Sequence, residues 1–253
     1  MTVHFVGAGP GAADLLTVRA TRLVEECDVC VYAGTYVEAV LSLCGPDTRL
    51  VDTQHLDLDQ IVGELVAAHE AGRDVVRLCS GDPSLYSALT EQTRRLDAAG
   101  VPWDVTPGVP AYAAAAATLG VELTVPELVQ TVVLTRTQAR STAMPASESL
   151  AATAAIGGSL VLHLAITRVR SLAEELVASY GADCPVAVVA FASQEREVVI
   201  RGTLADVADA VEAAGLRHTA VIIVGRALGS RTDASCVAES HLYDPARART
   251  QPD

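Results

Sequence analysis

The sequence predicts an α/β protein of two domains, each built around a mainly parallel sheet. Short apolar runs recur along the chain without polar interruption, which is typical of strands that are covered on both faces. The segments between these runs carry apolar residues at helical spacing, as residues 58–71 and 204–214 do. A length of 253 residues suits two domains of about 120 residues each.

Seven apolar runs are the predicted strands, and they give the order of the elements. The runs lie at residues 3–6, 29–32, 75–79, 132–135, 160–164, 186–190 and 220–224. One helix-length segment joins the first run to the second, and another joins the fifth run to the sixth. These two connections predict right-handed parallel crossovers.

The boundary between the domains is predicted from an Ala-rich helix. This helix is expected to start near Pro110 and to stop at Gly120, and we place the boundary just after it, near residue 121. The predicted domains are residues 1–120 and 121–230. A polar tail without a clear period follows over residues 231–253, and we expect it to be extended or partly disordered.

The composition excludes several classes of function. A net charge of −13 argues against nucleic-acid binding, which depends on Lys and Arg to neutralise phosphates. All 18 basic residues are Arg, so the chain cannot form a lysine Schiff base, supply a P-loop lysine or use a lysine general base. No apolar stretch approaches the roughly 20 residues that span a bilayer, and the first residues lack the pattern of a secretion signal. We therefore expect a soluble, cytoplasmic protein without a nucleic-acid or membrane partner.

The six cysteines indicate reduced core thiols rather than disulfides or a metal site. They are scattered and lie mostly inside apolar runs: Cys27, Cys30, Cys44, Cys79, Cys184 and Cys236. The first two have the spacing of metal ligands, but no second pair follows them. No metal is therefore expected.

The first candidate site is the glycine-rich turn after the first predicted strand. The segment VGAGPGAADLLTVRA resembles a dinucleotide-binding fingerprint. However, Pro10 has no N–H to offer a pyrophosphate, and the next predicted strand ends in YAGTY without an acid for a ribose diol. A nicotinamide or flavin site and a turn that serves packing alone both remain open at this point.

The second candidate is the segment SGDPSLY, in which Asp82 lies between Gly81 and Pro83 after a buried strand. Ligands of parallel sheets bind beyond the carboxyl ends of the strands, so this segment and the glycine-rich turn are expected to line one crevice. A carboxylate there suits a cationic or hydroxyl-rich ligand. The alternative is that Asp82 is the N-cap of a helix near residues 85–96.

The third candidate is the segment TPGVPAYAAAAATLG, which gives a helix face with almost no side-chain bulk. Two prolines flank Gly108, and the alanines at 111 and 113–117 follow. Small residues let a ligand approach closely, but they serve tight helix packing equally well.

Together and in this order, the three segments resemble the signature segments of the tetrapyrrole methylase family. Its members are S-adenosylmethionine-dependent C-methyltransferases of corrin and sirohaem synthesis. The resemblance continues through LHL, YGADCPVAVVAFAS, VIRGTL and TAVIIVG, and so covers nearly the whole chain. It implies the class III methyltransferase architecture, with two α/β domains, and a homodimer.

The resemblance also implies which residues bind the cofactor, S-adenosylmethionine. They come from all three candidate segments and from the second domain: Pro10, Ser80, Gly81, Asp82, Leu85, Pro110, Ala111, Leu164, Ala192, Thr219 and Ala220. Relatives often carry Met where this chain has Leu164 and Gly where it has Ser80. Neither difference threatens a site made largely of backbone and apolar contacts.

A methyltransferase of this kind needs no activated side chain, because a sulfonium methyl is already a strong electrophile. Transfer to carbon needs an electron-rich substrate carbon, in-line approach at about 3 Å and exclusion of water. The catalytic residues are therefore unknown at this point, and the sequence contains no Ser-His-Asp order or metal-ligand set.

The implied substrate is a tetrapyrrole with several carboxylates, and an acidic protein needs local Arg side chains to attract it. The candidate substrate contacts are Tyr32, His55, Arg77, Tyr112 and Arg136. Each has a structural alternative, such as a turn for His55, helix packing for Tyr112 and a surface ion pair for Arg136.

Overall fold

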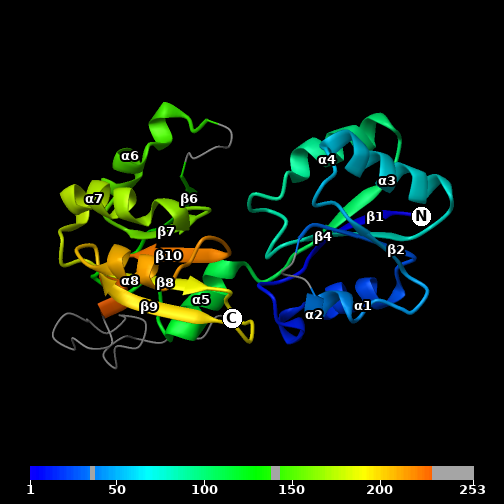
Figure 1. Cartoon of the computed structure of the whole chain (residues 1–253). Helices are drawn as coiled ribbons and strands as arrows, with labels where there is room; N and C mark the ends of the chain where they lie inside the picture. Colours follow the sequence, from blue (N-terminus) through cyan, green and yellow to red (C-terminus); the bar gives the residue numbers. More distant parts are fainter. Residues whose placement is uncertain (35–37, 138–142, 230–253) are drawn as a thin grey trace, which may run out of the picture. The chain divides into compact units, whose positions relative to one another are not determined.

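Two five-stranded sheets form the framework of the chain, as the computed structural model in Figure 1 shows. The structure describes residues 1–34, 38–137 and 143–229. The predicted tail over residues 231–253 lies outside these ranges. The first sheet has the strand order β3-β2-β4-β1-β5, and the second has the order β6-β7-β10-β8-β9.

Every pairing in the first sheet is parallel. Its strands are β1 (Val3–Gly7), β2 (Val29–Tyr32), β3 (Arg49–Asp52), β4 (Val75–Cys79) and β5 (Trp103–Thr106). Because all five run in one direction, their carboxyl ends lie at the same edge of the sheet. The loops that carry the first three candidate segments all leave from this edge.

Helices cover both faces of the first sheet. They are α1 (Val18–Glu26) and α2 (Glu38–Leu41) below the sheet in Figure 1, and α3 (Leu58–Glu70) and α4 (Leu89–Ala98) above it. Side chains alternate between the faces, so that Val3 and Phe5 pack with α3 and α4, whereas Val6 packs with α1 and α2. Each such fully buried side chain contributes about 1.5–3 kcal/mol to folding.

Local sequence signals mark where α1 and α3 begin. The Asp57 carboxylate accepts from the backbone N–H of Gln60, and the Gln60 side chain accepts from the backbone N–H of Asp57, which is a capping box at the start of α3. At the start of α1, the Thr17 hydroxyl accepts from the backbone N–H of Ala20.

The second sheet mixes strand directions. Its strands are β6 (Val132–Arg136), β7 (Ser159–His163), β8 (Pro185–Ala190), β9 (Val198–Thr203) and β10 (Ala220–Val224). Strand β6 is parallel to β7, whereas β10 lies between β7 and β8 and is antiparallel to both, and β9 is antiparallel to β8. The helices of this half are α6 (Leu150–Ala154), α7 (Val169–Tyr180) and α8 (Val207–Ala213), with α7 packing beside α6 and α8.

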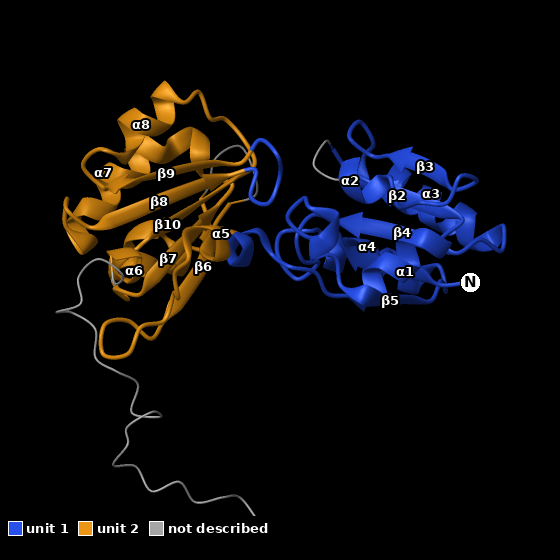
Figure 2. Ribbon diagram, turned by 90° about the horizontal axis from the view of Figure 1, so that it is seen from below, with its two compact units in different colours: residues 1–114, 191–196 blue, residues 115–190, 197–253 orange. Residues whose placement is uncertain are grey.

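The chain divides into two compact units, and a single boundary in the sequence does not separate them (Figure 2). Unit 1 contains residues 1–114 and 191–196, and unit 2 contains the rest. The division falls within α5 (Ala111–Leu119), whereas the sequence suggests a boundary after this helix, near residue 121. The return of residues 191–196 to unit 1 has no counterpart in the sequence prediction.

All seven predicted strands are present, and both pairs of runs that the crossovers join are parallel within their sheets. The sequence missed β3, β5 and β9, and it missed the antiparallel insertion of β10 between β7 and β8. The helix predicted near residues 85–96 begins only at Leu89. Among the described residues, no helix is both long and apolar enough to cross a membrane.

Candidate functional site

The three candidate segments of unit 1 meet at the carboxyl edge of its parallel sheet. They follow β1, β4 and β5, which are neighbours in the sheet order. The turn after β1 is joined to the turn after β4 by three backbone hydrogen bonds: Ala8 N–H to the Cys79 carbonyl (2.8 Å), Gly9 N–H to the Gly81 carbonyl (3.2 Å), and Gly81 N–H to the Gly9 carbonyl (2.8 Å). The predicted crevice-lining pair of loops is therefore one connected backbone structure.

Three glycines let these loops approach each other. A Cβ on Gly7 would lie 2.5 Å from the backbone nitrogen of Gly108 and 2.8 Å from the carbonyl oxygen of Gly81. A Cβ on Gly108 would meet the same carbonyl oxygen and would lie 2.8 Å from the Cα of Gly7. No side chain fits at either position unless the backbone moves. Gly81 in turn has a φ of +66°, which favours glycine, and faces Pro110 and Ala111 at the start of α5.

Asp82 joins the second loop to the third. One carboxylate oxygen accepts from the N–H of Gly108 at 2.8 Å, and the other accepts from the N–H of Ser84 at 2.8 Å and from its hydroxyl. Burial alone would raise the pKa of Asp82, but the hydrogen bonds from Ser84 and Gly108 outweigh it and hold this pKa below its usual value. The N-cap interpretation is wrong, because the residue at the start of α4 is Ala88.

We expect Asp82→Asn to loosen this connection. An amide retains one acceptor oxygen, so at least one of the two backbone N–H donors loses its partner, and the free energy of unfolding should fall by about 1–2 kcal/mol. Because the folded-state pKa of Asp82 is lowered, its contribution is present above the unfolded-state pKa and is lost as the pH falls through the folded-state value. Denaturant unfolding at several pH values measures this dependence.

The matched control for this variant is Asp47→Asn, which removes the same charge from an exposed turn. The difference in unfolding free energy between the two variants should be largest at neutral pH and should shrink below the usual Asp pKa. If both variants behave alike at neutral pH, the bonds of Asp82 contribute nothing to stability.

The first glycine turn does not lead directly into a helix of the dinucleotide type. The turn passes into a short 3-10 helix, Ala13–Leu15, and α1 begins only at Val18. The carbonyl of Pro10 accepts from the side-chain amide of Gln194 at 3.2 Å. The arrangement that would present helix N–H groups to a pyrophosphate is therefore not built at this turn.

The loop between β8 and β9 completes the surroundings of the glycine turn. Besides the bond from Gln194 to Pro10, the hydroxyl of Ser193 accepts from the N–H of Ala12 at 3.1 Å. A Cβ on Gly11 would lie 2.8 Å from the side-chain nitrogen of Gln194. Ala192, which the resemblance assigns to the cofactor, is buried in this same loop.

The remaining cofactor candidates of unit 2 gather at one edge of its sheet. Ala220 pairs with Ala190 at the end of β8, and Ile222 pairs with Leu162 in β7, so the start of β10 lies beside the ends of β7 and β8. Leu164 and Thr219 flank these strands at that edge, with φ values of +53° and +54°, and Leu164 is 65% exposed. Non-glycine residues in this conformation cost about 1–3 kcal/mol each and cluster at functional sites.

Four of the candidate substrate contacts lie at the carboxyl edge of the unit 1 sheet, in α5 or at the end of β6. Tyr32 ends β2 and His55 follows β3, so both lie at the carboxyl edge of the unit 1 sheet, and Tyr112 lies in the first turn of α5. Arg136 ends β6 in unit 2, where it pairs in register with His163 and so reaches the same edge as Leu164.

Arg77 is the candidate whose position argues against its predicted role. Its side chain is buried in β4, where Nε donates to the Gln92 side-chain oxygen at 3.0 Å and Nη1 donates to the carbonyls of Val31 and Leu78. A substrate carboxylate would have to reach a guanidinium that is already bonded in the core. Arg77 therefore has a structural role, in which its side chain links β4 to α4.

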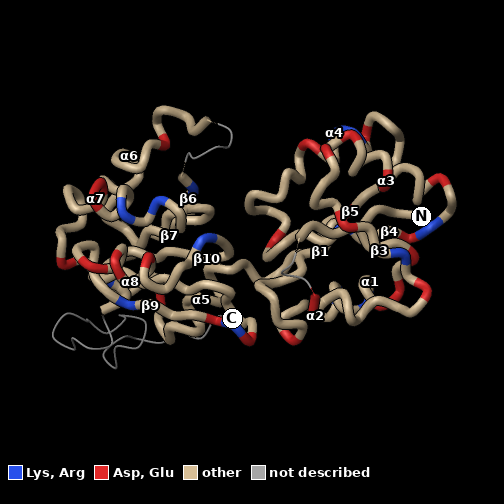
Figure 3. The backbone as a smooth tube through the Cα atoms, viewed as in Figure 1, with Lys and Arg blue, Asp and Glu red and all other residues tan. Residues whose placement is uncertain are grey.

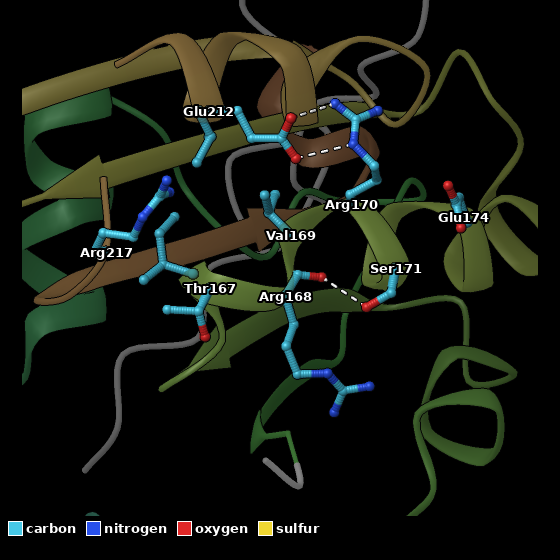
Figure 4. Close-up of a pocket in the computed structure, with 10 residues that line it drawn as sticks. Thr167, Arg168, Val169, Arg170, Ser171, Glu174, Glu212 and Arg217 are labelled. Carbon is cyan, nitrogen blue, oxygen red and sulfur yellow. Dashed lines mark hydrogen bonds and ion pairs between the residues drawn. The ribbon is translucent and has the colours of Figure 1, made fainter. Parts of the chain in front are cut away.

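A pocket of about 550 Å³ lies in unit 2, and none of these candidates lines it (Figure 4). It is lined by the start of α7, the end of α8 and Arg217. The Arg170 guanidinium is paired with Glu212 and Asp209, and the side chains of Arg168 and Arg217 point in different directions in Figure 4. The charges in this pocket do not converge on one point, and it is no candidate for the predicted site.

Sequence reasoning missed three residues of the loop cluster. In the sequence Gly108 is marked only by the prolines on either side of it, although its closeness to Gly7 is what lets the third loop join the cluster. Ser193 and Gln194 carried no signal, because their partners are more than 180 positions away in the chain. Among the described residues, no group of His, Cys, Asp and Glu side chains has an arrangement that could hold a metal ion.

Comparison with known proteins gives consistent matches. Residues 2–208 match the family described as Tetrapyrrole (Corrin/Porphyrin) Methylases. A Precorrin-4 C(11)-methyltransferase of Rhodococcus erythropolis is 54% identical over 251 residues, which cover 99% of both chains.

Two solved structures share the fold. The X-ray structure of a cobalamin biosynthetic enzyme, cobalt precorrin-4 methyltransferase, is similar with a TM-score of 0.87 and 35% identity, covering 90% of this chain and 95% of that one. Uroporphyrin-III C-methyl transferase from Thermus thermophilus, complexed with S-adenosyl homocysteine, is similar with a TM-score of 0.77 and 29% identity, covering 90% and 99%. These similarities confirm the predicted two-domain α/β architecture.

Proposed function

Because the chain belongs to the tetrapyrrole methylase family, we propose that it transfers a methyl group from S-adenosylmethionine to carbon 11 of precorrin-4, giving precorrin-5. The observation that carries this proposal is the 54% identity to a Precorrin-4 C(11)-methyltransferase across 99% of both chains. Particular segments support the same member of the family, namely VYAGTYV, QHLDLDQI, ELTVPELVQTVVLTR and SHLYD.

The loops of unit 1 fit a bound S-adenosylmethionine because they offer backbone and small side chains. Pro10, Gly81, Pro110 and Ala111 belong to the connected loop cluster, and Ser80 is exposed beside it. We propose that these residues bind the cofactor, together with Leu85, Leu164, Ala192, Thr219 and Ala220. Asp82, which the resemblance also assigns to the cofactor, shapes the loops as well, since both of its carboxylate oxygens are bonded within the cluster.

In this reaction the protein positions the cofactor and the substrate, and it excludes water. When bound, S-adenosylmethionine supplies an electrophilic methyl group, and the substrate supplies an electron-rich ring carbon. Residues that hold the two in line at about 3 Å lower the barrier without acting as acid or base. No catalytic side chain is assigned for this reason.

The carboxylates of the substrate must be bound by an acidic protein. Figure 3 shows acidic positions spread over both units, with few basic ones. Long-range attraction to an anionic substrate is therefore unfavourable, and local donors must offset it. We propose Tyr32, His55, Tyr112 and Arg136 as substrate contacts and exclude Arg77 because it is bonded in the core.

Incubation with S-adenosylmethionine and precorrin-4 tests the function. The expected result is a product heavier by one methyl group, located at carbon 11 by NMR of the isolated macrocycle. Cobalt-precorrin-4, precorrin-2 and uroporphyrinogen-III are tested in parallel, and faster methylation of any of these assigns the chain to another activity of the family. The 35% identical structural relative is named for the cobalt form, so the comparison between precorrin-4 and cobalt-precorrin-4 is the most informative one.

Calorimetric titration separates this function from that of an oxidoreductase, and the turnover assay separates it from that of a carrier. A methyltransferase binds S-adenosylhomocysteine, whereas a nucleotide-dependent oxidoreductase binds NAD or NADP. A carrier that merely holds a tetrapyrrole shows ligand spectra without turnover. Binding of a dinucleotide alone would reject the methyltransferase proposal.

Arg136→Ala tests the substrate side of the proposal. A charge-assisted hydrogen bond contributes about 1.5–3 kcal/mol, so KM for the tetrapyrrole should rise at least tenfold while KM for S-adenosylmethionine stays constant. Arg170→Ala is the matched control, because Arg170 is paired with Glu212 and Asp209 beside the pocket of Figure 4. An unchanged KM in Arg136→Ala would remove this residue from the site.

We also propose that the enzyme is a cytoplasmic homodimer. The resemblance to the family supports the dimer, and light scattering of the purified protein tests it directly. A mass of one chain over a wide range of concentrations would contradict the proposal.

A further inference from the structure

The loop between β8 and β9 contacts three consecutive residues of the glycine turn. The side-chain amide of Gln194 donates to the carbonyl of Pro10 at 3.2 Å, and the hydroxyl of Ser193 accepts from the N–H of Ala12 at 3.1 Å. Between these two bonds, a Cβ on Gly11 would lie 2.8 Å from the side-chain nitrogen of Gln194 and 2.9 Å from its amide carbon, so this side chain packs directly against the Gly11 backbone. Both ends of the segment 10–12 are therefore held by side chains that lie more than 180 positions away in the sequence.

Contacts within the loop give it a defined shape. Strands β8 and β9 pair along their whole length, so residues 191–197 close an antiparallel hairpin. The N–H of Gln194 donates to the carbonyl of Phe191 at 2.9 Å, and the guanidinium carbon of Arg196 lies 4.1 Å from the centre of the Phe191 ring. Phe191 and Ser193 have φ values of +52° and +65°, a costly conformation for residues other than glycine that is found mainly at functional sites. The loop is thus built to hold the turn in one place.

The same contacts limit which ligands the turn can bind. In residues 8–12 the first two N–H groups donate to carbonyls at the end of β4 and in the loop after it, and Pro10 has no N–H. The N–H of Ala12 donates to Ser193, so at most the N–H of Gly11 remains for a ligand. A turn that binds phosphate groups needs several such donors. This turn therefore suits a ligand that is held by carbonyls and apolar contacts and carries a positive charge.

We propose that Ser193 and Gln194 are positioning residues for methyl transfer, which hold the glycine turn in the shape that binds S-adenosylmethionine. This inference rests on the proposed function, in which Pro10 contacts the cofactor. The two bonds fix the turn before the cofactor arrives, so the free energy of binding does not have to offset the ordering of the turn. Without them the cofactor binds more weakly, whereas the tetrapyrrole, whose proposed contacts lie in other segments, binds equally well.

Two variants remove the bonds one at a time. Gln194→Met keeps a side chain of similar length but cannot donate to the Pro10 carbonyl. Ser193→Gly removes the acceptor of the Ala12 N–H, and glycine adopts a φ of +65° without strain. The stability of Ser193→Gly should stay close to that of the wild type, because the relief of strain offsets the lost hydrogen bond. A loss of cofactor affinity in this variant therefore reports positioning rather than unfolding.

Gln130→Met is the matched control for the substitution of Gln194. The side-chain amide of Gln130 also donates to backbone carbonyls, those of Val125 and Val129 in unit 2, and Gln130 is not among the residues proposed for the cofactor or the substrate. Calorimetric titration with S-adenosylhomocysteine measures the affinity for the cofactor product. Its Kd should rise about fivefold in Gln194→Met and in Ser193→Gly and should stay at the wild-type value in Gln130→Met.

Steady-state turnover supplies the second readout. In both loop variants KM for S-adenosylmethionine should rise by the same factor as the Kd, while KM for the tetrapyrrole stays constant. Wild-type affinity in both loop variants would overturn the positioning role and leave the proposed function standing, and so would an equal rise of both KM values. A wild-type protein that does not bind S-adenosylhomocysteine would reject the proposed function and this inference together. If Gln194→Met does not fold, the result for Ser193→Gly decides.

Discussion

Gly108→Ala should cost the protein both stability and cofactor binding. The added Cβ would meet the carbonyl oxygen of Gly81 and would lie 2.8 Å from the Cα of Gly7, and neither group is the flexible end of a side chain. Forcing an extra carbon into such a contact costs about 1–3 kcal/mol. Because the third loop must move away, the start of α5 moves with it, and a displacement of about 1 Å in a positioning site lowers activity about 100-fold.

The control for this substitution is Gly63→Ala, in the middle of α3. A Cβ on Gly63 meets no atom within 4 Å, so only helix propensity changes, and the variant should gain about 1 kcal/mol. Denaturant unfolding measures stability, and titration with S-adenosylhomocysteine measures binding. A Gly108→Ala protein that unfolds and binds like the wild type would show that the three-glycine contact is not what holds the loops together.

Gln92→Leu should destabilise unit 1 strongly, because it removes the side-chain partner of a buried cation. Gln92 is 1% exposed, accepts from Arg77 Nε at 3.0 Å, and donates to the carbonyls of Ser87 and Ala88. Burial lowers the pKa of Arg77, which indicates how poorly its charge is solvated. Breaking a buried charge interaction on one side costs about 3–5 kcal/mol, and we expect a loss of about 3 kcal/mol here.

The double variant Arg77→Met with Gln92→Leu separates the charge from the packing. Replacing both partners by apolar groups is often neutral or stabilising, so this protein should recover most of the loss. Gln54→Leu, at an exposed position, should change stability by less than about 0.5 kcal/mol. If the double variant is as unstable as Gln92→Leu, then the bonds to Ser87 and Ala88 rather than the buried charge determine the effect.

The central strands and the edge strand β6 were predictable from the sequence, whereas the other three edge strands were not. Strands β1, β2, β4, β7, β8 and β10 lie inside their sheets, are covered on both faces and so read as unbroken apolar runs. Strands β3, β5 and β9 are edge strands with exposed, partly polar residues, such as Arg49 and Asp104, and their periodicity gives no such signal. The mixed strand directions in the sheet of unit 2 depend on how the strands pair, and no local sequence pattern indicates this pairing.

The candidate site was predictable to the extent that its residues follow buried strands. The turns around Pro10 and Asp82 are marked by glycine and proline after apolar runs, and the structure joins them by backbone hydrogen bonds. The late start of α4 was not predictable, because Tyr86 and Ala88 adopt positive φ values that only the folded surroundings impose. The burial of Arg77 was equally invisible, since a single Arg in an apolar run gives no sign of its partners.

Unit 1 is built from two separate stretches of the chain, residues 1–114 and 191–196. A fragment that ends at residue 114 would lack Ser193 and Gln194, and the N–H of Ala12 and the carbonyl of Pro10 would lose their partners. Recombination between relatives at a single crossover in α5 would therefore exchange an incomplete half. Chimaeras of these enzymes should therefore take residues 191–196 from the same parent as the N-terminal portion.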